Sequence, residues 1–376
     1  MEEQMYDDLR PYRDEEIPAA MHRIADHPSF QSLSAYLYPG VPLAEVQQQF
    51  RNIRTVRQFQ LEIMEKAIQT IVAKSMRGFT CHGLERLDPE KRYLFVSNHR
   101  DILLDSALLQ IALVARGMPT TEITFGSNLM QGQLVIDIGK SNKMFKVIRG
   151  GNPRDFYHHS VHLSHYIRHT LLEKKESVWI AQRNGRTKDG HDATDQGLVK
   201  MFSLSGGPDV LEGLAQLNIV PVAISYQYET CDNLKARELY LSREQKYIKA
   251  PGEDLHSILA GVTEEKGFVH MEVMPPLERT ELARFRQLEK NEVITAIARL
   301  IDQRIYQGFR LWNTNYIAWD MLYHTFDYAD RYTSEEYRAF AARMHERIGC
   351  FEGNQIELMD LFLKIYANPV GDHKPE

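Results

Sequence analysis

The segment SNHRDILLD, residues 97–105, carries the side chains best suited to catalysis. It follows an apolar run typical of a strand and precedes an apolar run typical of a helix, a position where α/β sheets form their sites. His99 is suited to act as a general base because imidazole titrates near neutral pH. A carboxylate must orient that imidazole, and Asp101 and Asp105 both follow closely enough to do so. The residues alone leave both aspartates open.

Two other interpretations of this segment have to be weighed. Asn98, His99 and Asp101 could simply cap the following helix, a common role for Asn and Asp. The letters HRD also begin the catalytic loop of protein kinases, but that loop has an asparagine where this chain has Ser106. The sequence also lacks a glycine-rich phosphate loop before HRD and a DFG motif after it, so the kinase interpretation fails.

Two further strand-like runs each lead into a loop that could bind an anion. The first, KMFKVIRGGNPRD, ends on Arg149, two glycines and Arg154. The second, VWIAQRNGRTKDG, leads into Gly185, Arg186 and Lys188, with Arg183 nearby. Glycines let backbone approach an anion, and arginines bind it through two parallel hydrogen bonds. Taken singly, each loop could equally be an ordinary charged turn.

Together with His99, these loops resemble the glycerolipid acyltransferase superfamily, which includes glycerol-3-phosphate and lysophosphatidate acyltransferases. The resemblance covers roughly residues 77–275, and four sequence blocks occur in the family's order. KMFKVIRG is similar to the second block and IVPVAI, residues 219–224, to the fourth. The first block departs by one residue, because Asp105 lies one position further from His99 than the family's aspartate. The third departs at Asn184, where the family has glutamate.

The resemblance implies a role for each site residue. His99 would be the general base and Asp105 its orienting carboxylate, with Asp101 as the alternative. The acceptor's headgroup would be bound by residues of the second and third blocks, namely Arg149, Arg154, Asn184, Gly185, Arg186 and Lys188. No metal and no cofactor is expected, since the acyl thioester is a co-substrate.

The function that the resemblance implies is O-acyl transfer in membrane lipid synthesis. A fatty acyl group would pass from coenzyme A or acyl carrier protein directly to a hydroxyl of a glycerol phosphate or lysophospholipid. An alternative acceptor is a lyso-aminolipid that carries glycine or ornithine, because a carboxylate suits an arginine site equally well. A second alternative is a non-catalytic lipid-binding relative, motivated by Asn184 and by the displaced Asp105.

Composition limits the partners and the location. The 376 residues carry a net charge of −6, which argues against nucleic-acid binding. Three widely separated cysteines suggest neither a disulfide framework nor a zinc site. The acidic N-terminus does not resemble a secretory signal, and no apolar run reaches the roughly 20 residues that span a bilayer. We expect a cytoplasmic protein, peripheral at the inner face of the cell membrane, with Leu103, Leu104, Trp312, Tyr316 and Trp319 as possible anchors.

The pattern along the chain predicts an α/β fold, with a mixed, mostly parallel sheet flanked by helices and helical additions at both ends. The resemblance implies the same class, a fold similar to that of glycerol-3-phosphate acyltransferases. We expect a helical subdomain over 1–75, an α/β acyltransferase domain over 76–315 and a helical extension over 316–376. Strands are predicted at 93–97, 122–125, 145–148, 177–181, 219–225 and 268–273. Pro221 should place its strand at an edge, at a bulge or near the strand's start.

Four histidines between the second and third blocks recur at helical spacing. His158, His162, His165 and His169 would form one narrow stripe on a helix, and such a stripe could hold a metal. The apolar residues of the same segment point to nearly the opposite side, so we expect the histidines to face solvent instead.

Overall fold

The computed structural model describes residues 5–148, 152–245 and 247–373. Its centre is a seven-stranded sheet of order β1-β7-β6-β2-β5-β3-β4. The strands are β1 (Gly78–His82), β2 (Leu94–Ser97), β3 (Glu122–Gly126), β4 (Met144–Val147), β5 (Val178–Ala181), β6 (Ile219–Tyr226) and β7 (Phe268–Val273).

The sheet is mixed and mostly parallel, which confirms the predicted fold class. β6, β2, β5, β3 and β4 run in one direction, so their carboxyl ends lie at one edge. β7 is antiparallel to β6, and the edge strand β1 is parallel to β7. All six predicted strands are present. β1 was not predicted, because its five residues are half-buried and exposed in turn and lack an apolar run.

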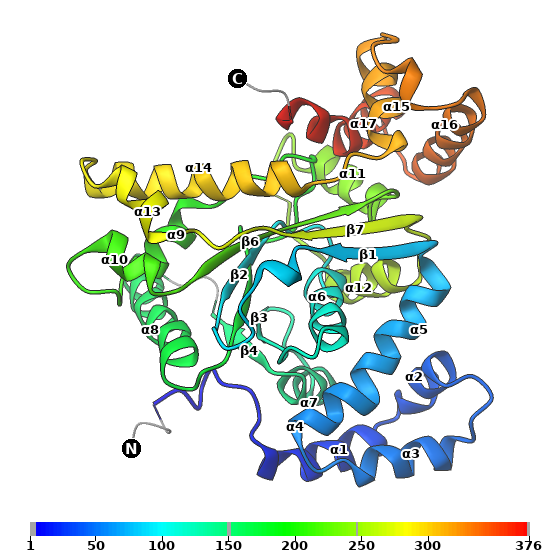
Figure 1. The fold of residues 1–376 in the computed structure, drawn as a ribbon. Coiled ribbons are helices and arrows are strands. Elements are labelled where there is room, and N and C mark those ends of the chain that lie inside the picture. The colour runs from blue at the N-terminus through cyan, green and yellow to red at the C-terminus, as the bar shows by residue number, and fades with distance from the viewer. Residues whose placement is uncertain (1–4, 149–151, 246, 374–376) are drawn as a thin grey trace.

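Helices cover both faces of the sheet (Figure 1). α8, α9 and α14 pack on one face, and α5 and α6 pack on the other. The helices are α1 (Ile17–Ala25), α2 (Phe30–Leu37), α3 (Leu43–Asn52), α4 (Val56–Gln58), α5 (Glu65–Ser75), α6 (Leu104–Ala115), α7 (Gln133–Ser141), α8 (Pro153–Leu172), α9 (Gln196–Ser203), α10 (Val210–Ala215), α11 (Asp232–Leu241), α12 (Glu253–Thr263), α13 (Arg279–Leu282), α14 (Lys290–Gly308), α15 (Asn313–Tyr323), α16 (Ser334–Gly349) and α17 (Gln355–Asp372).

The helices at the two ends of the chain have apolar cores of their own. α1, α2 and α3 bury residues such as Met21, Phe30 and Phe50 among themselves. α15, α16 and α17 do the same with Phe340 and Phe362, and α11 packs against them. α5 ends at Ser75 and α15 begins at Asn313, while the domain boundaries after residues 75 and 315 remain predictions.

Pro221 lies in a central strand, which excludes the first of its three predicted positions, an edge strand. β6 pairs with β2 on one side and with β7 on the other. Pro221 is the third residue of β6, and the antiparallel ladder with β7 begins only at Val222. Its missing N–H is therefore tolerated near the strand's start, the third of the predicted positions.

The histidine stripe on α8 is only partly directed at solvent. His158 and His165 are exposed, as predicted. The rings of His162 and His169 instead lie 5.3 and 5.2 Å from the ring of Tyr6, between centroids. The N-terminal segment thus covers part of the stripe, a contact that periodicity within one helix cannot reveal.

Candidate active site

His99 and Asp105 are in contact where β2 leads into α6. The Nδ1 atom of His99 lies 3.0 Å from Oδ2 of Asp105. The Asp105 side chain is fully buried, and the His99 side chain is 12% exposed. Asp101 has a different role, because its Oδ1 accepts hydrogen bonds from the backbone N–H groups of Leu103 and Leu104 at the start of α6. The structure therefore places Asp105, and not Asp101, against the imidazole.

The Asp105 carboxylate is held in place by four hydrogen-bond partners. Its Oδ2 also accepts from the backbone N–H groups of Arg100, at 2.7 Å, and Asp101, at 2.9 Å. Its Oδ1 accepts from the Tyr226 hydroxyl at 2.8 Å. Burial, together with the Asp105 charge, raises the pKa of Tyr226 well above its usual value, so that hydroxyl stays a donor. A carboxylate so supported can accept the Nδ1 proton of His99 and leave Nε2 free as a base.

Replacing Tyr226 by phenylalanine tests this support. The change removes one hydrogen bond to a charged group and leaves the ring in the core. Such bonds contribute about 1.5–3 kcal/mol. Because Asp105 keeps its other partners, we expect kcat to fall by roughly 3–30-fold with little change in KM. Steady-state kinetics would measure both constants, and a change in KM alone would contradict a positioning role for Tyr226.

A buried ionic cluster underlies the same loop. Arg100 is 1% exposed, and its Nη2 lies 2.6 Å from Oδ2 of Asp192. Its Nη1 lies 3.5 Å from Oε2 of Glu229. Burial opposes the charged form, but Asp192 and Glu229 outweigh it and raise the pKa of Arg100 above its usual range. Asp192 also accepts from the amide of Asn98 at 2.9 Å, so the residues on both sides of His99 are anchored.

The loop after β5 lies alongside His99. The backbone N–H of Thr187 donates to the carbonyl oxygen of His99 at 2.7 Å. Arg186, the preceding residue, is only 8% exposed, and its Nη1 has no hydrogen-bond partner in the described part of the chain. This arginine lines a cavity of about 180 Å³ together with His256 and Ser257. A buried guanidinium nitrogen without a partner is unusual and suits an anionic ligand.

Comparison with known families decides the class of the enzyme. Residues 78–225 match the family model described as Acyltransferase. The chain carries an acyltransferase domain. The match runs from β1 to β6 and includes His99, Asp105 and Arg186. The predicted resemblance and the predicted enzyme class, an acyltransferase, are confirmed at that level.

Two other comparisons add little to the identification of the acyltransferase. One solved structure, the 1-acyl-sn-glycerophosphate (LPA) acyltransferase PlsC from Thermotoga maritima, is 13% identical and aligns with a TM-score of 0.37. The alignment covers 76% of this chain and 94% of that one. At this level the likeness carries no conclusion about substrate. No curated protein matches the sequence closely enough to count as a relative.

The structure does not bring all of the predicted headgroup residues of the acyltransferase together. Asn184 is exposed, and Gly185, with a φ of +79°, forms the turn before Arg186. Lys188 is paired with Glu238 of α11. Arg154 is exposed in the first turn of α8, and no described contact joins it to the Arg186 cavity. Arg149 lies outside the described residues.

A larger cavity of the acyltransferase, of about 450 Å³, lies away from His99. It is lined by Thr120, Glu122, Lys143 and Glu176, which stand at the amino ends of β3, β4 and β5. The carboxyl ends of parallel strands are where α/β sheets bind their ligands. Position in the sheet therefore favours the smaller cavity beside Arg186.

The sequence did not reveal the residues that support the catalytic dyad of the acyltransferase, His99 and Asp105. Tyr226 ends β6, a strand that the pattern did predict, so its position at the catalytic edge was a usable signal. Arg100 had no such signal, because its partners Asp192 and Glu229 are far away along the chain. A buried ionic cluster assembled from three loops leaves no local pattern.

Proposed function

We propose that this acyltransferase moves a fatty acyl group from an acyl thioester to a hydroxyl of a glycerol phosphate or lysophospholipid, with His99 as general base. The observation that carries the proposal is the His99 imidazole, oriented by buried Asp105 next to the Arg186 loop. Nε2 of His99 takes the hydroxyl proton while the oxygen attacks the thioester carbonyl. The C–S bond breaks, an ester forms, and the proton passes to the departing thiolate.

The headgroup of the acceptor is assigned to the Arg186 cavity. Two acidic residues that line it already have partners: Glu238 pairs with Lys188, and Glu253 accepts from the Tyr247 hydroxyl at 2.7 Å. Arg186 is thus a cationic group with an unused donor. A phosphate oxygen would satisfy that donor through a charge-assisted hydrogen bond.

Arg186→Gln tests this assignment. The variant keeps a donor and loses the charge, so we expect KM for a phosphate acceptor to rise by roughly 10–100-fold, because a charged hydrogen bond contributes about 1.5–3 kcal/mol. kcat should change less, since the thioester chemistry lies at His99. Arg116→Gln is the matched control, because Arg116 is an exposed arginine directly after the end of α6 and pairs with Glu85. An unchanged KM in Arg186→Gln would contradict the assignment of the headgroup to this cavity.

The choice of acceptor is tested by comparing acyl transfer to several candidate acceptors. The wild-type protein would be supplied with radiolabelled acyl-CoA or acyl carrier protein thioester and with glycerol-3-phosphate, lysophosphatidate or a lyso-aminolipid. We expect ester formation with one of the two phosphate acceptors. The lyso-aminolipid is the alternative acceptor because its carboxylate would suit an arginine site equally well, and preference for that acceptor would replace the proposal. Inactivity with every acceptor would favour a non-catalytic lipid-binding role.

Work at a membrane surface is also part of the proposal. No helix in the described ranges is both long and apolar enough to cross a bilayer. Leu104 and Trp312, predicted as anchors, are buried in the core, so that prediction is wrong for them. Exposed apolar side chains instead occur at Ile248, Leu255 and Leu259, next to or on α12, which also lines the Arg186 cavity. We infer that this side faces the lipid, at the inner face of the cell membrane.

A further inference from the structure

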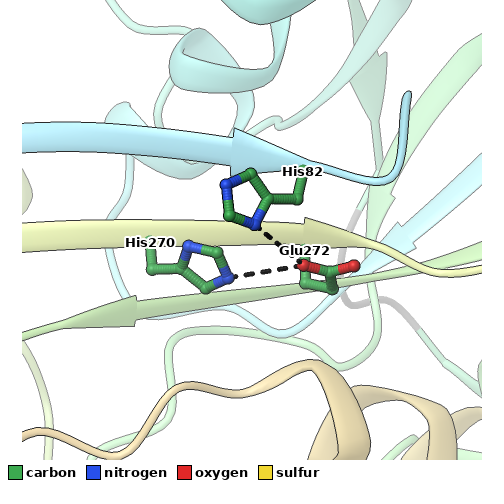
Figure 2. A group of neighbouring side chains, drawn as sticks. All are labelled: His82, His270 and Glu272. Atoms are coloured by element: carbon green, nitrogen blue, oxygen red, sulfur yellow. Dashed lines mark ion pairs between the residues drawn. The ribbon is translucent and has the colours of Figure 1, made fainter. Parts of the chain in front are cut away.

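Two histidines and a glutamate converge where β1 and β7 lie side by side (Figure 2). His82 stands opposite Glu272 in the strand register, and His270 lies two residues before Glu272, on the same face. Oε2 of Glu272 is 3.8 Å from Nδ1 of His82 and 3.4 Å from Nε2 of His270. The three ligand atoms all lie within 4.8 Å of one another.

These separations are close to those of a tetrahedral zinc site. Nitrogen and oxygen ligands bind Zn²⁺ at about 2.0–2.2 Å, which puts neighbouring ligand atoms roughly 3.3–3.5 Å apart. The His270–Glu272 separation already has this value. The His82 side chain is 63% exposed, so its ring has room for the small rotation that closes the remaining gap. Two histidines and a carboxylate, with an open fourth position, are an established zinc ligand set.

Neighbouring groups hold the two inner ligands in the orientation that a metal needs. Nδ1 of His270 lies 2.8 Å from the Thr80 hydroxyl, which fixes that nitrogen and turns Nε2 toward Glu272. Arg86 binds the other carboxylate oxygen, Oε1, at 3.1 Å and leaves Oε2 for the metal. Such outer partners fix the tautomer and orientation of metal ligands.

We propose that His82, His270 and Glu272 bind a divalent transition-metal cation, for which Zn²⁺ is the best fit, with water in the fourth position. Ser225, opposite His270 across the β6–β7 ladder, has a buried hydroxyl without a partner among the described residues and suits such a water. The site is separate from the catalytic centre, because β6 lies between β7 and β2. A bound ion would add a cross-link between the edge strand β1 and β7, beyond the ladder that already pairs them.

Calorimetric titration of the metal-free, full-length protein with ZnCl₂ tests the proposal. We expect one ion per chain, with loss of that binding in both His82→Ala and His270→Ala. Thr80→Val should weaken affinity by about 10-fold, as other outer-partner changes do. His345→Ala is the matched control, because His345 is an exposed histidine on α16. Bound Co²⁺ should show the visible absorption of a tetrahedral site in the wild-type protein and in the control.

Two outcomes overturn the proposal. One is an absence of Zn²⁺ binding in the wild-type protein. The other is equal binding by wild type, His82→Ala and His270→Ala, as expected if the histidines of α8 held the ion. Melting temperatures in chelator show whether each variant folds, and exposed His82 makes His82→Ala the safer of the two. Saturating Zn²⁺ should raise the wild-type melting temperature by about 2–5 °C and leave that of His82→Ala unchanged.

Discussion

Replacing His99 by alanine is expected to lower kcat for acyl transfer by roughly 10²–10⁴-fold, the usual contribution of a general base. The loss arises because no other described group touches Asp105 and can also take the acceptor's proton. The Asp105 carboxylate keeps its bonds to Tyr226 and to two backbone N–H groups, so the loop should stay folded. Transfer of a radiolabelled acyl group at saturating substrates gives kcat, and thermal unfolding checks the fold.

The control for His99→Ala is His22→Ala, which removes an exposed histidine on α1. That variant should match the wild-type protein in kcat. Activity of His99→Ala within threefold of wild type, with the fold intact, would exclude His99 as the base. The acceptor would then have to be activated by another group, and the dyad geometry would be structural.

The largest effect on stability is expected from Arg100→Met. Methionine fills much of the volume but leaves Asp192 and Glu229 buried without their cation, although Glu229 keeps Lys235 at 2.6 Å. Removing one partner of a buried ion pair costs about 3–5 kcal/mol. The free energy of unfolding from urea titration should fall by that amount, and activity should fall with it because the same cluster anchors the residues beside His99.

Arg116→Met is the matched comparison for that measurement. Arg116 and Glu85 form an ion pair with both side chains about half exposed, and their closest atoms are 3.4 Å apart. Pairs of that kind contribute no more than about 1 kcal/mol. If Arg100→Met lost no more stability than Arg116→Met, the buried cluster would not be what holds the loop.

Local features of the chain were predictable. Each of the six predicted strands is a short, mostly apolar run, so the existence of these strands followed from sequence. His99 and Arg186 could be named because strands that lead into polar loops point to one edge of a parallel sheet. β1 could not be predicted, because an exposed edge strand needs no apolar run.

Contacts between distant segments were not predictable. Nothing near Asp105 indicated that Tyr226 would bind its second oxygen, and nothing near His82 indicated that His270 would lie beside it. The burial of Trp312 likewise results from packing against a neighbouring element, Phe268 of β7. Such pairs are set by how strands are ordered in the sheet, and short-range patterns do not encode that order.

The backbone N–H groups of Arg100 and Asp101 both donate to Oδ2 of Asp105, the oxygen that also contacts His99. The hydrogen bonds that hold the loop in its conformation therefore also fix the orientation of the His99 imidazole. The one extra residue between His99 and Asp105, relative to the family's spacing, is compatible with this arrangement because two backbone N–H groups still face Oδ2 of Asp105. A search for related sites would therefore do better to look for a carboxylate bound by two backbone N–H groups beside a histidine. A fixed number of residues between histidine and aspartate would miss this enzyme.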